Sequence, residues 1–529
     1  MSRRTLILLT LLVAVTPFIS PFQRNLFVGD ETKYGQVIWE MRESGSLLVP
    51  QLEGRPYTHK PPIHFWMIWA LTWVFGTESI WPFVIPSLAG FLVLLWLVGR
   101  LAAELFGAHE WLSRFILASF WLVWGLAQTA RMDIGFTAAI TAAALLFWRW
   151  LESDSSLELN LAAVLIGIAI LIKGPMAAVI MMVLFITEVV RRRKRWRGSW
   201  WMALMIAAAI PFAWVIPATM AGGEEYSREL LIDQNVGRAV SSWTHAAPPW
   251  FYLLRYPVTF LPWSLVSIPA ILAIWKRRGE EDSKGSLRFC FTWVLAVIAP
   301  FSLLSGKLDV YMVPAMVPIA LLTARYLGSD RRDALEAWGI RLSRGLLIVF
   351  ALLFPLAITL APRFVDDPAE GAMLELPVIR GLFWLTGGAA LAGLALQLAH
   401  PNRNALRSAV IAALVTLVPL SYIVTALMPV ANDEVSSEPL VRVLAEQTLD
   451  GREVGLHGTP HLWAPDLPRS LRTARFLGAG ALRDPAGEAP RILATRRDRA
   501  DQLGPGLAGY RRVGEVTLKG KEIDVYRRD

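Results

Sequence analysis

Long apolar runs are the feature that most restricts the fold of this 529-residue chain. A helix needs about 20 mostly apolar residues to cross a ~30 Å hydrocarbon core. Backbone polar groups in lipid must be paired within the segment, so such runs are predicted to be helical. Thirteen runs of this kind occur, at 5–21, 81–102, 112–128, 134–152, 158–173, 175–190, 199–220, 250–275, 287–305, 309–328, 343–362, 377–399 and 408–430. The chain is therefore predicted to be a polytopic α-helical membrane protein.

The basic residues indicate one orientation for these predicted spans. Arg3 and Arg4 place the N-terminus inside, because cytoplasmic loops carry the excess of Lys and Arg. When the spans alternate from there, the basic clusters at 191–197, 276–278 and 331–332 also fall on the inner side. The net charge of +9 belongs almost entirely to the membrane part, since the last 99 residues hold 16 basic and 15 acidic residues. The positive charge therefore marks cytoplasmic loops, and no nucleic-acid partner is expected.

Hydropathy divides the chain into two predicted domains. Residues 1–430 form a transmembrane domain with outer loops at 22–80 and 221–249, and residues 431–529 follow on the outer side. The periodicity of this last segment predicts a helix at 441–449, strands at 452–458 and 490–495, a helix at 496–503 and a closing hairpin over 511–528. It is therefore predicted to be a small extracytoplasmic α/β domain.

The outer loop 22–80 carries the densest group of reactive side chains. Acid, base and phenol groups gather between residues 29 and 66, namely Asp30, Glu31, Lys33, Tyr34, Tyr57, His59 and Lys60. An ionisable group beside a membrane span is costly unless it faces water or a partner, so such a group indicates function. Asp30, next to Glu31 in a chain with few acids near its spans, is the first candidate for a catalytic carboxylate.

Four cations lie at the predicted outer membrane face, each beside a Pro, Gly or Asp in a short turn: Lys60, Arg131, Lys173 and Lys307. Snorkelling would explain one or two such residues. Four of them at one membrane face favour a phosphodiester or diphosphate held through charge-assisted hydrogen bonds. Asp133 is a further candidate, which either takes part in catalysis or only ends its helix and orients Arg131.

Tyrosines and histidines of the outer loops give weaker predictions. Tyr34, Tyr57 and Tyr311 can hydrogen-bond a sugar or a phosphate, although interface anchoring is the usual role of such residues. His59 and His245 lie in different outer loops and could share a divalent metal with Glu31, but no spacing motif supports this. The metal requirement stays open, and no other cofactor is predicted.

Several short motifs follow one another along residues 1–330. They read GDETKY at 29–34, LLVPQLEGRPYTHKPPIHFW at 47–66, PSLAG at 86–90, RMD at 131–133, IKGP at 172–175, DQNVGR at 233–238, HAAPPWFY at 245–252, LPW at 261–263 and SGKLDVYMVP at 305–314. In this order and spacing they resemble the aminoarabinose transferase family, membrane glycosyltransferases of the GT-C type that are more distantly related to protein mannosyltransferases. The predicted spans and outer C-terminal domain are also similar to that family.

The resemblance implies a donor, an acceptor and a location. The donor would be a sugar linked to undecaprenyl phosphate, and the acceptor lipid A or another cell-envelope molecule, at the outer face of the inner membrane. Asp30, Lys60 and Asp133 are the catalytic candidates. The substrate-binding candidates are Glu31, Lys33, Tyr34, Tyr57, Arg131, Lys173, Arg238, His245, Lys307 and Tyr311. The chain departs from the family at Lys33, where arginine is common, and at His59, where an acid often precedes the lysine.

Three alternatives remain from the sequence. A related enzyme could act on a protein or a polysaccharide, a flippase could move a lipid-linked sugar without chemistry, and a structural membrane protein could bind a partner through its outer domain. A transporter typically carries ionisable groups at the bilayer midplane. Here the charged candidates lie at the outer ends of spans, which favours an enzyme. The sugar, the acceptor and the oligomeric state are left open.

Overall fold

The computed structural model describes residues 1–194, 198–237, 246–282, 284–329, 334–364, 374–399, 404–448, 450–465, 467, 469–478, 481–482 and 489–528. The chain forms two compact units. Unit 1 comprises Met1–Ser20, His59–Pro61 and Ser87–Leu427, and unit 2 comprises Pro21–Thr58, Pro62–Pro86 and Met428–Asp529. Most of the loop predicted at 22–80 thus belongs to the same unit as the C-terminal segment.

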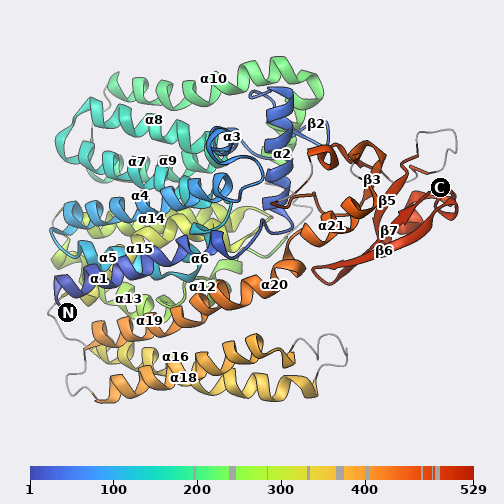
Figure 1. The fold of residues 1–529 in the computed structure, drawn as a ribbon. Coiled ribbons are helices and arrows are strands. Elements are labelled where there is room, and N and C mark those ends of the chain that lie inside the picture. The colour runs from blue at the N-terminus through green and yellow to red at the C-terminus, as the bar shows by residue number, and fades with distance from the viewer. Residues whose placement is uncertain are drawn as a thin grey trace. The chain divides into compact units, whose positions relative to one another are not determined.

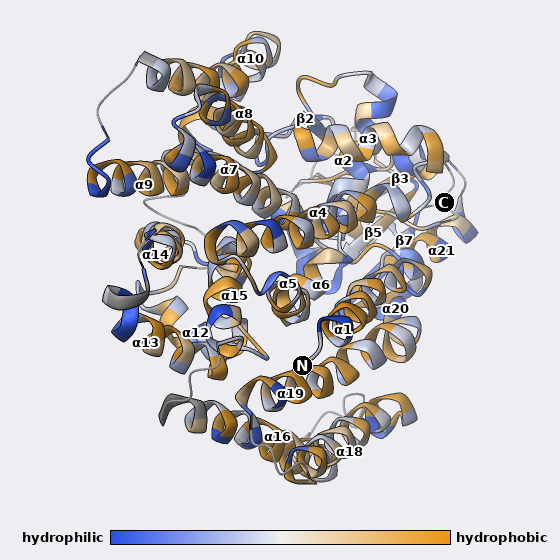
Figure 2. Cartoon of the chain, turned by 90° about the vertical axis from the view of Figure 1, so that its left-hand side faces the viewer, coloured by the Kyte–Doolittle hydropathy of each residue, from blue (hydrophilic) through white to orange (hydrophobic). Residues whose placement is uncertain are grey.

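Unit 1 is a bundle of helices (Figure 1). Its helices are α1 (Arg3–Val15), most of α4 (Trp81–Phe106), α5 (Glu110–Ser119), α6 (Trp121–Ala127), α7 (Asp133–Ser153), α8 (Ser156–Lys173), α9 (Met176–Arg191), α10 (Gly198–Arg228), α12 (Phe251–Thr259), α13 (Ser264–Glu281), α14 (Ser286–Leu303), α15 (Val313–Leu327), α16 (Ala334–Leu360), α18 (Pro377–Ala399) and α19 (Ala405–Tyr422). Helix α8 packs against α7, α9 and α10, and α16, α18 and α19 pack together. Figure 2 shows these helices as mostly hydrophobic along their lengths.

The described helices confirm a multi-pass membrane protein. Ten of them are long and apolar enough to cross a membrane, or eleven if the bent pair α12–α13 is one span. This count is lower than the thirteen predicted runs because run 175–190 is α9, with 16 residues, and run 112–128 is divided at Phe120. Phe120 is extended, and the next residue, Trp121, donates its backbone N–H to the Leu261 carbonyl at 2.9 Å. Apolarity alone does not show such a break.

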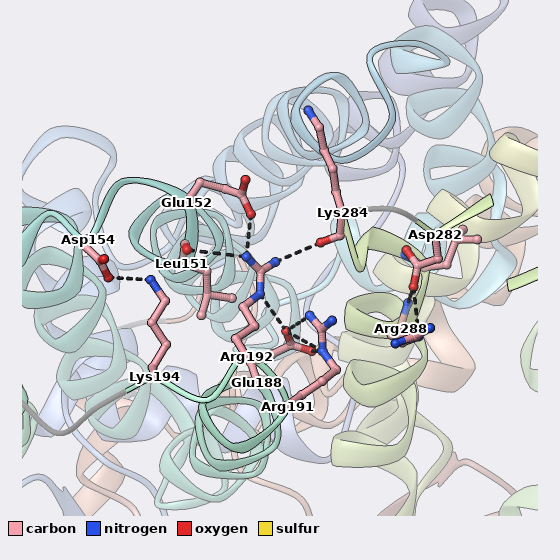
Figure 3. A network of polar contacts seen from close by, with 11 residues as sticks. Leu151, Glu152, Asp154, Glu188, Arg191, Arg192, Lys194, Asp282, Lys284 and Arg288 are labelled. Atoms are coloured by element: carbon pink, nitrogen blue, oxygen red, sulfur yellow. Dashed lines mark hydrogen bonds and ion pairs between the residues drawn. The ribbon is translucent and has the colours of Figure 1, made fainter. Parts of the chain in front are cut away.

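A network of charged side chains joins the ends of α7 and α9 that the sequence predicts to lie inside (Figure 3). Arg192 Nη1 donates to Glu152 Oε1 at 2.6 Å, and its Nη2 donates to the Lys284 carbonyl at 3.1 Å. Its Nε lies 3.4 Å from Oε2 of Glu188, whose side chain is fully buried and also pairs with Arg191. Arg192 therefore connects α7, α9 and the turn before α14.

Arg192→Ala should lower the thermal stability of the purified protein. The substitution leaves the buried Glu188 carboxylate with one fewer cation, and breaking a buried pair costs about 3 kcal/mol. The matched control is Lys194→Ala, because the partner of Lys194, Asp154, is 40% exposed and exposed pairs contribute little. A thermal melt in which both variants unfold at the wild-type temperature would contradict a stabilising role for this network.

Unit 2 joins residues from both ends of the chain. Its helices are α2 (Asp30–Ser44), α3 (Ile63–Phe75), α20 (Met428–Val435) and α21 (Glu438–Gln447), and its strands are β1 (Gln51–Leu52), β2 (Arg55–Pro56), β3 (Val454–His457), β4 (Arg475–Phe476), β5 (Ile492–Arg496), β6 (Arg511–Leu518) and β7 (Lys521–Arg527). The Asn25 backbone N–H donates to Asn432 Oδ1 at 2.9 Å, and Val28 N–H donates to the Val435 carbonyl at 2.7 Å. These long-range bonds explain why 22–80 is not an isolated loop.

The C-terminal sheet has the strand order β4-β3-β5-β7-β6. Strands β4, β3 and β5 are parallel, and β7 is antiparallel to both β5 and β6. Leu440, Val441 and Leu444 of α21 are buried in the core beside this sheet. The predicted α/β domain is therefore confirmed, including its closing hairpin. The predicted helix at 496–503 is a 3-10 helix, Arg497–Leu503, and the two-residue strand β4 was not predicted.

His461 should make the stability of the protein depend on pH. Burial, with a smaller contribution from the charge of Lys33, lowers the pKa of His461 from its usual 6.5 to about 4, so its contact with Glu53 at 3.7 Å is not an ion pair at pH 7. The unfolded chain binds this proton first as the pH falls, so stability present above pH 6.5 should decline by up to about 3 kcal/mol towards pH 4. The melting temperature should fall less between pH 7.5 and pH 5 for His461→Gln than for the wild-type protein. An equal fall in both proteins would contradict this role of His461.

Candidate active site

A close helix crossing in unit 1 fixes the turn that carries Arg131. A Cβ atom added at Gly90 of α4 would lie only 3.2 Å from the backbone nitrogen of Gly135 in α7, so glycine permits this approach. At the same crossing Ser87 Oγ donates to the Arg131 carbonyl at 2.7 Å. The PSLAG and RMD motifs therefore meet in space, and the turn before α7 is held by α4.

Asp133 is the first residue of α7 and is almost completely buried. Its Oδ1 accepts a hydrogen bond from Lys173 Nζ at 2.5 Å, and its Oδ2 accepts one from Arg131 Nε at 3.0 Å. The helix N-terminus also favours a carboxylate at this position. Both oxygens are thus engaged by cations, which favours the predicted alternative in which Asp133 orients Arg131 over direct attack on a substrate.

Lys173 is the last residue of α8, and the chain turns directly after it. Gly174 has φ of 123°, which favours glycine, and Pro175 precedes α9. The ammonium group of Lys173 lies 5.2 Å from the ring centre of Phe136 and 5.0 Å from that of Tyr311, which stacks on Phe301. The structure therefore brings together four predicted site residues of unit 1: Arg131, Asp133, Lys173 and Tyr311.

Lys307 is a buried cation in the loop between α14 and the 3-10 helix η4 (Asp309–Met312). Its side chain is buried, and its Nζ donates to the carbonyl oxygens of Ala247 at 2.7 Å and Leu304 at 2.5 Å. Among the described residues, no carboxylate forms an ion pair with it. A buried charge is costly unless it is compensated. Lys307 is therefore well suited to hold an anionic group of a substrate.

Two further residues, which the sequence did not indicate as partners, hold this loop. Asp309 accepts hydrogen bonds from Arg255 of α12, at 2.6 and 3.2 Å, and from Thr259 Oγ1 at 2.8 Å. Arg255 and Asp309 are 54 residues apart, so no local pattern could relate them. Asp309 follows Lys307 by two residues, so this ion pair holds the loop that carries Lys307.

In unit 2, the acids of the GDETKY motif have different surroundings. The carboxylate of Glu31 accepts hydrogen bonds from Arg24 at 2.6 and 3.1 Å and from the Phe27 backbone at 2.8 Å, so it is engaged inside the unit. Asp30 is the first residue of α2, and its carboxylate is 42% exposed with Lys33 Nζ at 4.0 Å. Asp30 is therefore accessible, whereas Glu31 stabilises the turn that presents it.

The remaining predicted residues divide into three groups. Tyr34 and Tyr57 are buried in unit 2, with ring centres 5.3 and 5.9 Å from that of Phe65. Lys60 and His59 belong to unit 1, where Lys60 is partly exposed and His59 Nε2 lies 4.0 Å from Glu229 Oε1. The predicted binding residues Arg238 and His245 lie outside the described residues.

A metal site does not emerge from the part of the chain that the structure describes. No group of three or more His, Cys, Asp or Glu side chains is arranged there to hold a metal ion. Because His245 lies outside that part, the predicted sharing of a metal between His59, His245 and Glu31 stays a prediction.

Unit 1 is thus a helical bundle that holds a buried lysine in a loop, Lys307, and two partly buried cations on Asp133, and comparison with known proteins gives its class. The family model for dolichyl-phosphate-mannose-protein mannosyltransferase matches residues 59–217. The crystal structure of ArnT from Cupriavidus metallidurans bound to undecaprenyl phosphate has a TM-score of 0.76, with 18% identity over 99% of this chain and 98% of that one. The apo structure of the same protein gives a TM-score of 0.74.

Curated relatives carry the identification further. Undecaprenyl phosphate-alpha-4-amino-4-deoxy-L-arabinose arabinosyl transferase from Pseudomonas aeruginosa LESB58 is 30% identical over 419 residues, 76% of this chain and 73% of the relative. The enzyme of that name from Pseudomonas paraeruginosa is 29% identical over 92% of this chain and 86% of its own length. The chain is a multi-pass membrane glycosyltransferase. It belongs to the family of undecaprenyl phosphate-alpha-4-amino-4-deoxy-L-arabinose arabinosyl transferases, as the sequence motifs predicted.

Proposed function

We propose that the protein transfers 4-amino-4-deoxy-L-arabinose from an undecaprenyl phosphate carrier to lipid A at the periplasmic face of the inner membrane. The observation that carries this proposal is the 30% identity to the Pseudomonas aeruginosa transferase over 73% of its length. The fold agrees over nearly the whole chain with an ArnT that binds undecaprenyl phosphate. Fold alone would not support the proposal, so the residues of the site have to account for the chemistry.

The leaving group is a phosphate, so the site needs positive charge beside it. In the transfer, the bond between C1 of the sugar and an oxygen of the carrier phosphate breaks, and an acceptor oxygen bonds to C1. The released undecaprenyl phosphate gains negative charge, so a cation preorganised beside it stabilises the transition state. Lys307 suits this task because its ammonium group is buried and bonded to two carbonyl oxygens. Lys60 and Arg131 are the other predicted phosphate contacts.

Carboxylates have two separate roles in this proposal. Asp30, which is accessible, stabilises the positive charge that develops on the sugar ring, or removes a proton if the acceptor is a hydroxyl group. An acceptor phosphate is already anionic, so Asp30 then acts only through its charge. Asp133 positions Arg131 and Lys173 through its two ion pairs. Lys33, Tyr311, Arg238 and His245 remain proposed substrate contacts.

Mass spectrometry of lipid A tests the proposed function in cells. Lipid A from a strain with the intact gene should contain a species heavier by one aminopentose, and a deletion strain should lack it. Complementation with Lys194→Ala, a change at the ion pair with Asp154 on the predicted cytoplasmic side, should restore the species. Identical lipid A in the intact and deletion strains would contradict lipid A as the acceptor.

The proposed periplasmic orientation gives a topology prediction. The basic cluster that begins at Arg191 should lie in the cytoplasm, and the C-terminal domain should lie outside, as the distribution of Lys and Arg indicates. Reporter fusions after Lys194 and after Arg528 should therefore respond in opposite compartments. If both fusions report the same compartment, the orientation or the parity of the spans is wrong.

A further inference from the structure

Unit 2 contains a pocket of about 450 Å³ that none of the proposed catalytic groups lines. Its wall includes the last residues of the candidate span Arg3–Phe22, the first residues of Trp81–Phe106 and the end of Ala405–Val435. In the proposed topology all three of these ends lie at the outer surface of the membrane. The pocket therefore opens where the headgroup of an outer-leaflet lipid would lie.

The charges that line this pocket are already neutralised. Arg24 forms its ion pair with Glu31 at 2.6 Å, and Glu78 Oε1 accepts a hydrogen bond from the buried Arg472 at 3.0 Å. Neither charge is left to attract an ion of opposite sign. The wall therefore differs from the surroundings of Lys307 and does not favour a phosphate.

Neutral hydrogen-bonding groups remain open in the same wall. Within the described residues, Gln23 forms no side-chain hydrogen bond, and the Oδ1 of Asn432 accepts one from Asn25 N–H, which leaves its amide donor. The hydroxyl of Ser79 accepts from Trp81 N–H at 3.3 Å and keeps its own proton to donate. Amides and a hydroxyl in this arrangement match the hydroxyl groups of a carbohydrate.

Three aromatic residues complete the wall, Phe22, Trp81 and Trp463. Phe22 and Trp81 meet edge to face with ring centres 4.9 Å apart, and Phe22 is 71% exposed. The C–H groups on one face of a sugar ring pack against an aromatic face, which carries negative charge density. A pocket with apolar walls and a few directed polar groups is typical of small-molecule binding.

We propose that this pocket is an acceptor subsite that binds one sugar ring of the glycolipid, separate from the oxygen that receives the transferred sugar. The proposal rests on the proposed function, because it assumes a lipid acceptor with more than one sugar. It assigns to Gln23 and Trp81 a role in acceptor affinity and no role in the chemical step.

The test measures initial rates of the full chain in lipid nanodiscs with saturating lipid-linked donor. Two acceptors are compared, a disaccharide lipid A and an acylated glucosamine phosphate with a single sugar. Gln23→Ala and Trp81→Ala should each raise KM for the disaccharide by about fivefold to tenfold, as expected for a lost hydrogen bond or ring contact. Both should leave kcat, and all constants for the single-sugar acceptor, nearly unchanged. Trp96→Ala is the matched control, since Trp96 is an exposed residue of the same helix α4.

Other outcomes overturn the subsite. If KM for the disaccharide is unchanged in the variants, the proposed contact does not exist. If KM rises equally for both acceptors, the residues have a merely structural role. If the wild-type protein transfers sugar to neither acceptor, the proposed function fails, and native mass spectrometry then decides the subsite separately. In that experiment the wild-type protein should retain disaccharide lipid A while the pocket-filling Gln23→Trp does not, and equal retention contradicts the subsite.

Discussion

Asp30→Asn should lower turnover by roughly 100–1,000-fold, the effect of removing one electrostatic contact to a transition state. Asparagine keeps the shape and most hydrogen bonds of aspartate but removes its charge. That charge matters mainly after the bond to the carrier phosphate begins to break, so the affinity for the donor should change little. The measurement is kcat together with equilibrium binding of the lipid-linked donor to the purified protein.

Two companion variants make this result specific. Asp433→Asn changes an exposed carboxylate of unit 2 and should leave turnover unchanged. Asp133→Asn removes the carboxylate that holds Lys173 and Arg131, and we expect a milder loss that appears partly as weaker donor binding. Normal turnover of Asp30→Asn with an inactive Asp133→Asn would reverse the two assignments.

Lys307→Met should also lower turnover by about 100-fold or more, and it should weaken donor binding, because the buried ammonium group then no longer faces the carrier phosphate. Its effect on stability should be the opposite of an ordinary core substitution. Removing the ammonium group relieves the desolvation cost of a buried charge, which offsets the loss of its two hydrogen bonds to carbonyl oxygens. The melting temperature without substrate should therefore stay the same or rise while activity is lost.

This combination separates a functional cation from a structural one. If Lys307 only stabilises its loop through Ala247 and Leu304, Lys307→Met should unfold at a lower temperature and keep the catalytic constants of its folded fraction. Lys276→Met, at an exposed residue near the end of α13, is the control for loss of one positive charge. Lys60→Ala should show the same large loss of turnover if Lys60 also contacts the phosphate.

The spans and the C-terminal domain were predictable because each follows from local periodicity. Apolar runs identify membrane helices whatever their partners are, and alternation in 511–528 indicates a hairpin that the structure confirms as β6 and β7. The division of 112–128 at Phe120 was not predictable, since it depends on the bond from Trp121 to Leu261, far along the chain. The same limit applies to 22–80, which is joined to the C-terminal segment by bonds such as Asn25 to Asn432.

The residues of the candidate site could be predicted from the sequence, but their ion-pair and hydrogen-bond partners could not. Their charge at the predicted outer membrane face singled out Arg131, Asp133 and Lys173, and the structure brings all three together. Nothing in the sequence showed that Glu31 is engaged by Arg24, although it stands beside the accessible Asp30. Partners are set by tertiary packing, so a single sequence indicates which groups are unusual and leaves their contacts open.

A reconstituted transfer reaction tests the central claim most directly. Purified protein, undecaprenyl phosphate-linked aminoarabinose and lipid A are combined in nanodiscs, and both lipids are followed by mass spectrometry. The account predicts that lipid A gains one aminopentose for each undecaprenyl phosphate released, and that Asp30→Asn and Lys307→Met lose this activity. A donor that stays intact, or that releases free sugar without modified lipid A, would contradict it.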